Sequence, residues 1–193
     1  MTDKKACCIK RFYFAKEKVH EQTYDSLDCQ KLGEEFCKWF YQLLNAENPS
    51  LAQERGDWGP QHFWDNSVLK FEYNTTQTNR EEYRGAQMAS LRLLSLTREE
   101  TLIFNPNMDS EGLKCANTPH GLVVVAVAGT VHRDNFCLGI FEQIFGLVNC
   151  PVTKNWKIKC INLKIIGHNV SGPSESLTRP CIKYETRDLE KLL

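Results

Sequence analysis

The side chains of this sequence that could move protons are a carboxylate, a tyrosine and two histidines. Glu142 lies inside an apolar run, Tyr73 lies at the end of a predicted strand, and His62 and His132 lie in short connecting segments. Positioned groups of these kinds carry general acid–base catalysis. Each also has an ordinary structural role, as a solvated carboxylate, a half-buried core tyrosine or a hydrogen-bonded imidazole. Because no strand carries a convincing inward pair of ionisable groups, the sequence predicts a protein that is not an enzyme.

The sequence contains no motif for a cofactor or a metal ion. Its nine cysteines include no Cys-x-x-Cys pair, and no His-Glu-x-x-His, Gly-x-x-x-x-Gly-Lys or Gly-x-Ser-x-Gly pattern occurs. The aromatic stretch Gly56–Asp65 could either form a binding surface or anchor a core. Core packing is the commoner role for such rings. If the stretch instead forms a binding surface, Trp64 is its candidate binding residue.

The composition of the sequence limits which partners and which cellular compartment it favours. The 193 residues include 24 Lys plus Arg and 24 Asp plus Glu, a balance that favours neither nucleic acid nor a membrane surface. No apolar run approaches the roughly 20 residues of a membrane span. Irregular cysteine spacing without an N-terminal leader favours a reducing compartment. We therefore expect an intracellular protein of the cytoplasm or nucleus, without disulfides.

The chain length favours one domain with short extensions. The predicted boundaries are an N-terminal arm at residues 1–24, a domain at 25–167 and a C-terminal tail at 168–193. Gly167–Ser174 has the composition of a linker. Asp188–Leu193 is predicted to form either a short helix or no ordered structure.

The first half of the domain mixes helical and strand patterns. Apolar residues at three- and four-residue spacing indicate the first helix, and alternation indicates the first strand. Thr78–Glu81 fits a capping box that starts a helix, and Pro60 can open a short helix that turns Phe63 and Trp64 inward. The predicted elements are a helix over Ser26–Asn45, a short helix from Pro60, a strand over Val68–Tyr73, a second long helix from Thr78 to about Thr97, a strand over Thr101–Phe104 and a loop over Asn105–Gly112.

Three long apolar runs follow, and they predict an antiparallel meander. They are Leu122–Val131, Phe136–Val148 and Trp156–Ile166, separated by short polar connections. The predicted fold is α+β, a curved, mostly antiparallel sheet packed on N-terminal helices. Because the strands are apolar on both faces, we expect the outer face of the sheet to be covered as well.

The order and spacing of these strands resemble the cone-shaped nuclear transport factor 2-like superfold. Val125–Val131 resembles its small-residue strand, Gly139–Phe145 its Phe-x-Gln-x-Phe strand and Trp156–Leu163 its Trp-initiated strand. In that superfold a curved sheet wraps over a long first helix and leaves a pocket between them. The superfold includes isomerases and dehydratases, which makes proton abstraction beside a carbonyl the enzymatic hypothesis.

The resemblance also implies positions for a binding site. Glu142 falls near a pocket-mouth position. Asn162 stands near where the transport factor uses acidic residues to meet its small GTPase, and this departure argues against GTPase binding. Alternation places Gln143 on the face opposite Glu142, and either face could line the pocket. The predicted pocket or pocket-mouth residues are Tyr73, Glu142, Gln143, Asn162 and Trp64.

Five motifs are similar to an uncharacterised family known as chromosome 3 open reading frame 38. They are Cys37–Phe40, Trp58–Trp64, Ser90–Leu96, Gly129–Arg133 and Leu138–Leu147. The resemblance runs from about Asp28 to Ile166 and implies a part in regulating apoptosis. It also implies a further helical region upstream, so that the first 24 residues would be a divergent or truncated start.

Two functions of different class follow from these patterns. The first is a non-catalytic interaction module that binds a protein partner, or a second copy of itself, through the sheet face. The second is a small-molecule binding protein, or an isomerase- or dehydratase-like enzyme, that uses the pocket of the cone. Strands apolar on both faces favour the first.

Overall fold

The computed structural model describes residues 21–74, 77–167 and 179–193. Most of the predicted N-terminal arm and the predicted linker after Gly167 lie outside the described residues. The described elements are α1 (Glu21–Asn45), η1 (Pro60–His62), β1 (Phe63–Asn74), β2 (Thr78–Arg84), α2 (Ala86–Arg98), β3 (Leu102–Pro106), β4 (Leu113–Asn117), β5 (Leu122–Arg133), β6 (Phe136–Asn149), β7 (Trp156–Gly167) and η2 (Thr186–Leu192).

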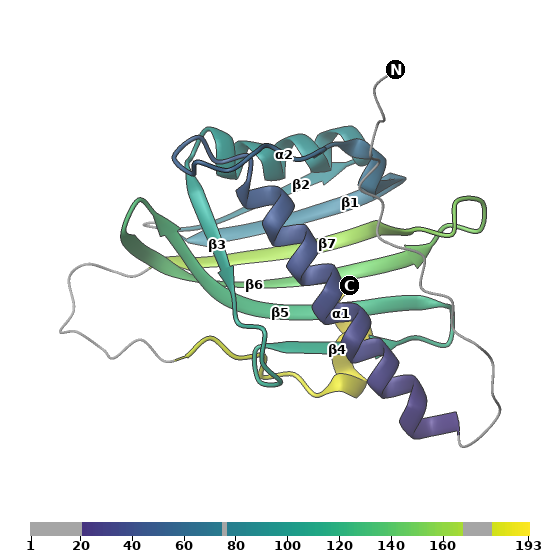
Figure 1. Ribbon diagram of the computed structural model, residues 1–193. Helices are drawn as coiled ribbons and strands as arrows, with labels where there is room; N and C mark the ends of the chain where they lie inside the picture. The colour runs from purple at the N-terminus through teal and green to yellow at the C-terminus, as the bar shows by residue number, and fades with distance from the viewer. Residues whose placement is uncertain (1–20, 75–76, 168–178) are drawn as a thin grey trace.

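Seven strands form one curved sheet, six of them in the order β2-β1-β7-β6-β5-β3 and the seventh, β4, paired with β5. All neighbouring strands are antiparallel except β1 and β7, which are parallel. The edge of β5 that faces away from β6 pairs with two strands, β3 along one half and β4 along the other. Figure 1 shows α1 lying across one face of this sheet, with α2 beside β1 and β2. Among the described residues, no helix is long and apolar enough to span a membrane.

The main core lies between α1 and the inner face of the sheet, and aromatic rings fill it. Phe145 of β6 packs edge-on against Phe36 and Phe40 of α1, with ring centroids 4.9 and 4.8 Å apart. Tyr41 of α1 and Phe104 of β3 contact Phe141, which lies four residues before Phe145 in β6. Aromatic rings bury large areas and supply much of the free energy of folding in such a core.

A second apolar cluster covers the opposite, outer face of the sheet. It joins β5 and β6 to Ile182 and Leu189 of the C-terminal segment Arg179–Leu193, which we call the tail. The sheet residues of the cluster are Val124, Ala126, Ala128 and Ile144. The expectation that the outer face is covered is therefore confirmed, and part of the cover comes from the chain itself.

Several predicted elements are confirmed. The first helix ends at Asn45 as predicted but begins earlier, at Glu21. The three strands of the meander match β5, β6 and β7 to within two residues at each end. In β1, Leu69 and Phe71 point into the core, as their alternation predicts. The α+β class and the mostly antiparallel sheet also follow the prediction.

The predicted start of the second helix is wrong. Thr78–Arg84 forms β2, which pairs antiparallel with β1, and α2 begins only at Ala86. The reason is alternation: Glu81 and Tyr83 are partly buried toward α2, while Arg80 and Glu82 face outward. A hairpin with β1 satisfies the backbone of this segment, which outweighs the local capping-box pattern. The chain then turns at Gly85, whose φ of 92° suits glycine.

Two further differences concern strands. Pro60 opens only the three-residue η1, and Phe63 and Trp64 belong to the long strand β1 instead of a helix. The sequence analysis also missed β4, which pairs with β5 next to the loop that follows β3. Five residues are too few for a reliable periodic signal, and only the neighbouring edge of β5 makes this segment a strand.

The expectation that no disulfide forms is wrong for one cysteine pair. Cys29 of α1 and Cys115 of β4 are bonded, with Cα atoms 5.7 Å apart and a separation of 86 positions along the chain. The helix approaches the strand closely here, because a Cβ atom at Gly33 would lie 3.2 Å from that of Cys115. Cysteine spacing in the sequence could not reveal a pair that only this crossing brings together.

Replacing Phe145 tests the inner core. The ring is fully buried between Phe36 and Phe40, so Phe145→Ala should lower the free energy of unfolding by about 3 to 5 kcal/mol. Phe136→Ala, at a ring that is 74% exposed, is the matched control and should change it by less than about 0.5 kcal/mol. Urea denaturation measures both, and equal effects would contradict the assignment of the inner face.

Candidate functional site

A row of alternating charges crosses the outer face of four strands. The strand registers align Glu142 of β6 with Lys164 of β7, Lys164 with Glu72 of β1, and Glu72 with Arg80 of β2. Glu72 binds both neighbours, with N–O distances of 3.2 Å to Lys164 and 2.8 Å to Arg80. These two hydrogen-bonded cations hold the pKa of the Glu72 carboxyl below its ordinary value.

A second row lies two residues along the same strands and meets the end of the tail. It aligns Ile144, Asn162, Lys70 and Glu82 from β6 to β2. The amide of Asn162 donates a hydrogen bond to the carbonyl of Leu192, and the Lys70 ammonium donates one of 3.2 Å to the carbonyl of the next residue. The tail is therefore held at its end by side chains of the sheet.

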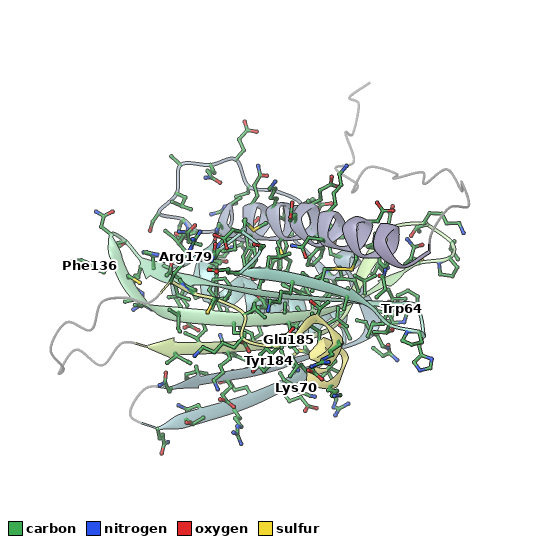
Figure 2. All side chains as sticks on the ribbon, turned by 90° about the horizontal axis from the view of Figure 1, so that it is seen from below. Trp64, Lys70, Phe136, Arg179, Tyr184 and Glu185 are labelled. Atoms are coloured by element: carbon green, nitrogen blue, oxygen red, sulfur yellow. A yellow bond between two sulfur atoms is a disulfide. The ribbon has the colours of Figure 1, made fainter. Side chains whose placement is uncertain are left out.

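The two rows and the tail enclose a cavity of about 470 Å³ on the outer face. Figure 2 shows Tyr184 and Glu185 on the tail, with Lys70 beside it and Trp64 to one side. The cavity has apolar floor residues and a rim that carries both signs of charge. Its lining includes Lys70, Glu72, Arg80, Glu81, Glu82, Glu142, Ile144, Asn162, Lys164, Tyr184 and Leu192. The volume is in the range of ordinary ligand sites.

Glu142 lies half-buried beside this cavity, under Tyr184 of the tail. Burial raises the pKa of the Glu142 carboxyl, and the hydrogen bond from Tyr184 together with the charges of Lys164 and Lys183 offsets only part of that shift. The negative charge of Glu142 in turn raises the pKa of the Tyr184 hydroxyl. A smaller cavity, of about 190 Å³, lies on the other side of this pair and shares Glu142, Lys164 and Tyr184 with the first.

The inner face holds a different kind of polar pair. The Tyr41 hydroxyl donates a 2.6 Å hydrogen bond to Oε1 of Gln143, and both side chains are buried. The side-chain nitrogen of Gln143 has no hydrogen-bond partner among the described residues. Among those residues, the one buried carboxylate is Glu47, which follows α1 and pairs with Arg98, the last residue of α2. No histidine of the described residues is buried.

The structure brings only two of the five predicted site residues together. Glu142 and Asn162 line the outer cavity together, whereas Gln143 lies in the inner core. Tyr73 donates a hydrogen bond to Glu81, which also accepts one from Arg92 of α2, so this tyrosine belongs to a network that ties β2 to α2. Trp64 is half-buried on β1 and lines neither of the two cavities.

Sequence reasoning missed most of the residues that define the outer cavity. Lys70 and Lys164 alternate with core residues on apolar strands, a signal that marks them as outward but not as neighbours. Tyr184 and Leu192 lie on the tail, for which the sequence left order and disorder open. In the described part of the chain, no three His, Cys, Asp or Glu side chains are grouped so that they could hold a metal ion.

The fold defines the class of protein. The chain is similar to nuclear transport factor 2 of Cryptosporidium parvum, with a TM-score of 0.52 and 20% identity over 72% of this chain and 94% of that one. It is also similar to a protein of unknown function from Mycobacterium tuberculosis, with a TM-score of 0.51 and 14% identity over 80% of this chain and 82% of that one. The structure is a nuclear transport factor 2-like α+β fold.

The sequence comparison gives the family. Residues 30–175 match the DUF4518 C-terminal domain, and the chain belongs to that family. It is 54% identical over 178 residues to the uncharacterized C3orf38 homologue of Mus musculus and 53% identical to that of Rattus norvegicus. These matches cover 92% of this chain and 51% of each relative, so the chain spans about half the length of the curated relatives it matches. The family resemblance noted in the sequence is confirmed.

A double-mutant cycle tests the buried pair of Tyr41 and Gln143. Tyr41→Phe removes the donor and leaves the Gln143 oxygen unpaired in the core, so it should lower the free energy of unfolding by about 1 to 3 kcal/mol. Adding Gln143→Met removes the orphaned amide and should recover most of that loss. Urea denaturation measures the cycle, and purely additive losses would contradict the pairing.

The pKa shift of Glu142 predicts a pH dependence. Because burial raises its pKa in the folded state, the folded chain takes up a proton at higher pH than the unfolded chain, and the penalty for the charge is largest above the folded pKa. Glu142→Gln should therefore stabilise the fold at pH 7, by less than about 1 kcal/mol since the group is partly solvated. This gain should disappear as the pH falls toward 4.

Glu72→Gln is the matched control for this prediction and has the opposite sign. The pKa of Glu72 is lowered by its hydrogen bonds to Arg80 and Lys164, so its carboxylate contributes stability at neutral pH that is lost as the pH falls through the folded pKa. Thermal unfolding between pH 4 and 7 measures both variants. A Glu142→Gln curve parallel to that of the unmodified chain would contradict the burial of Glu142.

Proposed function

We propose that this chain is a non-catalytic interaction module that binds a segment of a protein partner on the outer face of its sheet. The observation that carries the proposal is the cavity of about 470 Å³ between the tail and strands β7, β1 and β2. Apolar side chains on its floor, such as Ile144, can bury apolar side chains of a partner. The polar rim offers hydrogen bonds and charges that orient an extended segment.

The charge of the cavity supports a protein segment over an anionic ligand. Its lining includes three basic residues and four acidic ones, and several of these pair with each other across the strands. A nucleotide or nucleic-acid site would need an excess of unpaired cations. A peptide with both signs of charge meets a balanced rim without leaving a large uncompensated charge.

The alternative is a small molecule bound or transformed inside the cone, and the inner face offers little for it. Aromatic rings fill the space between α1 and the sheet. The polar pair there has no group suited to proton transfer near neutral pH, because burial raises the pKa of Tyr41 well above its ordinary value and Gln143 does not titrate. These observations support the non-catalytic proposal.

An intracellular location, in the cytoplasm or nucleus, belongs to the same proposal. So does the part in regulating apoptosis that the family resemblance implies. The disulfide gives the location a physical readout, since thiols in those compartments are kept reduced. A Cys29–Cys115 pair that is oxidised in the cell would therefore contradict a location in the cytoplasm or nucleus.

A charge exchange on the cavity rim tests the function. Arg80→Glu with Glu82→Lys reverses two exposed charges of β2 at the cavity and keeps the net charge. The matched control, Glu34→Lys with Lys38→Glu, makes the same exchange on α1. Proteins captured by the full chain are identified, purified and titrated against each variant. The rim variant should bind at least about tenfold more weakly, whereas the control should bind like the unmodified chain.

Two outcomes would contradict the proposed function. A captured protein that binds the rim variant and the control variant equally well would place the interaction elsewhere. A full chain that captures no protein at all would contradict an interaction module. The control exchange, at a half-buried and an exposed position of α1, should leave the free energy of unfolding within about 0.5 kcal/mol of the unmodified value. The rim exchange breaks the Glu72–Arg80 pair and places like charges on opposite strands, so it should lower that free energy slightly. Thermal unfolding verifies before the titrations that both variants are folded.

A further inference from the structure

The tail lies on the sheet as a bound segment, held largely through its backbone. The amide of Asn107 donates a 2.8 Å hydrogen bond to the carbonyl of Pro180, and the Lys114 ammonium donates one of 2.7 Å to the carbonyl of Tyr184. The N–H group of Ile182 donates one of 2.8 Å to the carbonyl of Glu111. Contacts to backbone groups do not depend on the side chains of the bound segment, so another segment could make them.

Two side chains anchor the tail by burial. Ile182 is 3% exposed and Leu189 is fully buried, and both pack on the small outward residues of β5 together with Ile144 of β6. Gly146 leaves room nearby, since a Cβ atom there would lie 3.1 Å from a side-chain carbon of Leu193. Most of the other tail side chains are exposed. Selectivity of the surface therefore rests on two aliphatic anchors and their spacing.

The tail does not use all of the surface on which it lies. The cavity continues from Leu192 across β7, β1 and β2, where charged side chains of both signs line it and the tail covers only part of them. Tyr184 also covers Glu142 and leaves that carboxyl half-buried, which raises its pKa. A segment that extends into the cavity would bury more area than the tail does, and could displace it.

We propose that the outer face is a docking site for a foreign protein segment with the chemistry of the tail, and that the tail competes with it from within the chain. The segment has an aliphatic residue, a tyrosine two positions later and, five positions after that, a leucine in a short 3-10 helix, as Ile182, Tyr184 and Leu189 do. It continues into the cavity beside Leu192. This inference rests on the proposed function and names the kind of partner.

The test uses a fluorescent peptide with the sequence of residues 179–193 and the full chain. In one variant of the chain, Ile182→Ser with Leu189→Ser weakens the docking of its own tail. Because the internal competitor is then less populated, the variant should bind the peptide at least about tenfold more tightly than the unmodified chain does. A peptide carrying serine at the same two positions is the control and should bind neither form.

A second measurement needs no variant of the chain. Excess peptide added to the unmodified chain should speed hydrogen exchange of the tail amides, while the amides of β5 and β6 stay protected. The protein captured through the rim of the cavity should compete with the peptide for binding. Tail exchange that stays unchanged at millimolar peptide, or a captured partner that does not compete, would overturn the inference.

The outcomes separate this inference from the function on which it rests. A partner that needs the cavity rim but does not compete with the peptide would leave the proposed function standing and remove the role of the tail. A peptide that binds while no cellular protein does would leave the docking site but contradict the interaction module. A dimer of the unmodified chain that the peptide dissociates would make a second copy the occupant, and would overturn the assignment to a foreign segment.

Discussion

Strands β5 and β6 are apolar on both faces, and other elements of the chain pack against each face. Successive side chains of a strand point to opposite faces, so Val125 and Val127 enter the inner core while Val124 and Ala126 form the outer cluster. A sheet with one solvated face would carry polar residues there. The helix α1 covers the inner face and the tail covers part of the outer one. Burial of both faces is therefore the constraint that fixes where helix, tail and cavity lie.

The two faces are covered in different ways, and this difference decides where a partner can bind. On the inner face, rings from α1, β3 and β6 interlock and form a dense core. On the outer face, small side chains of β5 leave a shallow surface that an extended segment with two aliphatic anchors can fill. Closely packed rings exchange for another occupant only at a large loss of contact. An anchored segment can leave while the rest of the core stays intact.

Glu142 is the position where the local pattern and the fold disagree. Its strand alternates core residues with outward ones, which is typical of a solvated carboxylate, yet the tail covers it and burial raises its pKa. Such a disagreement is typical of sites that carry function. Asn162 of β7 and Lys70 of β1 also donate hydrogen bonds to the tail. One distant strand, β1, and two consecutive strands, β6 and β7, thus contribute to one surface.

Much of the fold could be predicted from local patterns. The spacing of apolar residues is sufficient for α1, β5, β6 and β7, and motifs along these elements are sufficient for the family. The errors occur where a distant partner decides the structure. β2 fits a capping box and becomes a strand only because β1 pairs with it, and β4 is a strand only beside β5. The Cys29–Cys115 pair exists because α1 crosses β4.

The same distinction holds for the candidate site. Alternation by itself determined that Glu142 and Gln143 lie on opposite faces of one strand, because the side-chain period of a strand is fixed by its backbone. It could not determine which face is packed with rings and which meets a cavity. That depended on the register that aligns Glu142, Lys164, Glu72 and Arg80 across four strands, and on the tail that closes over them. Register and docking are set by contacts between residues far apart in the chain, so only the tertiary structure decided them.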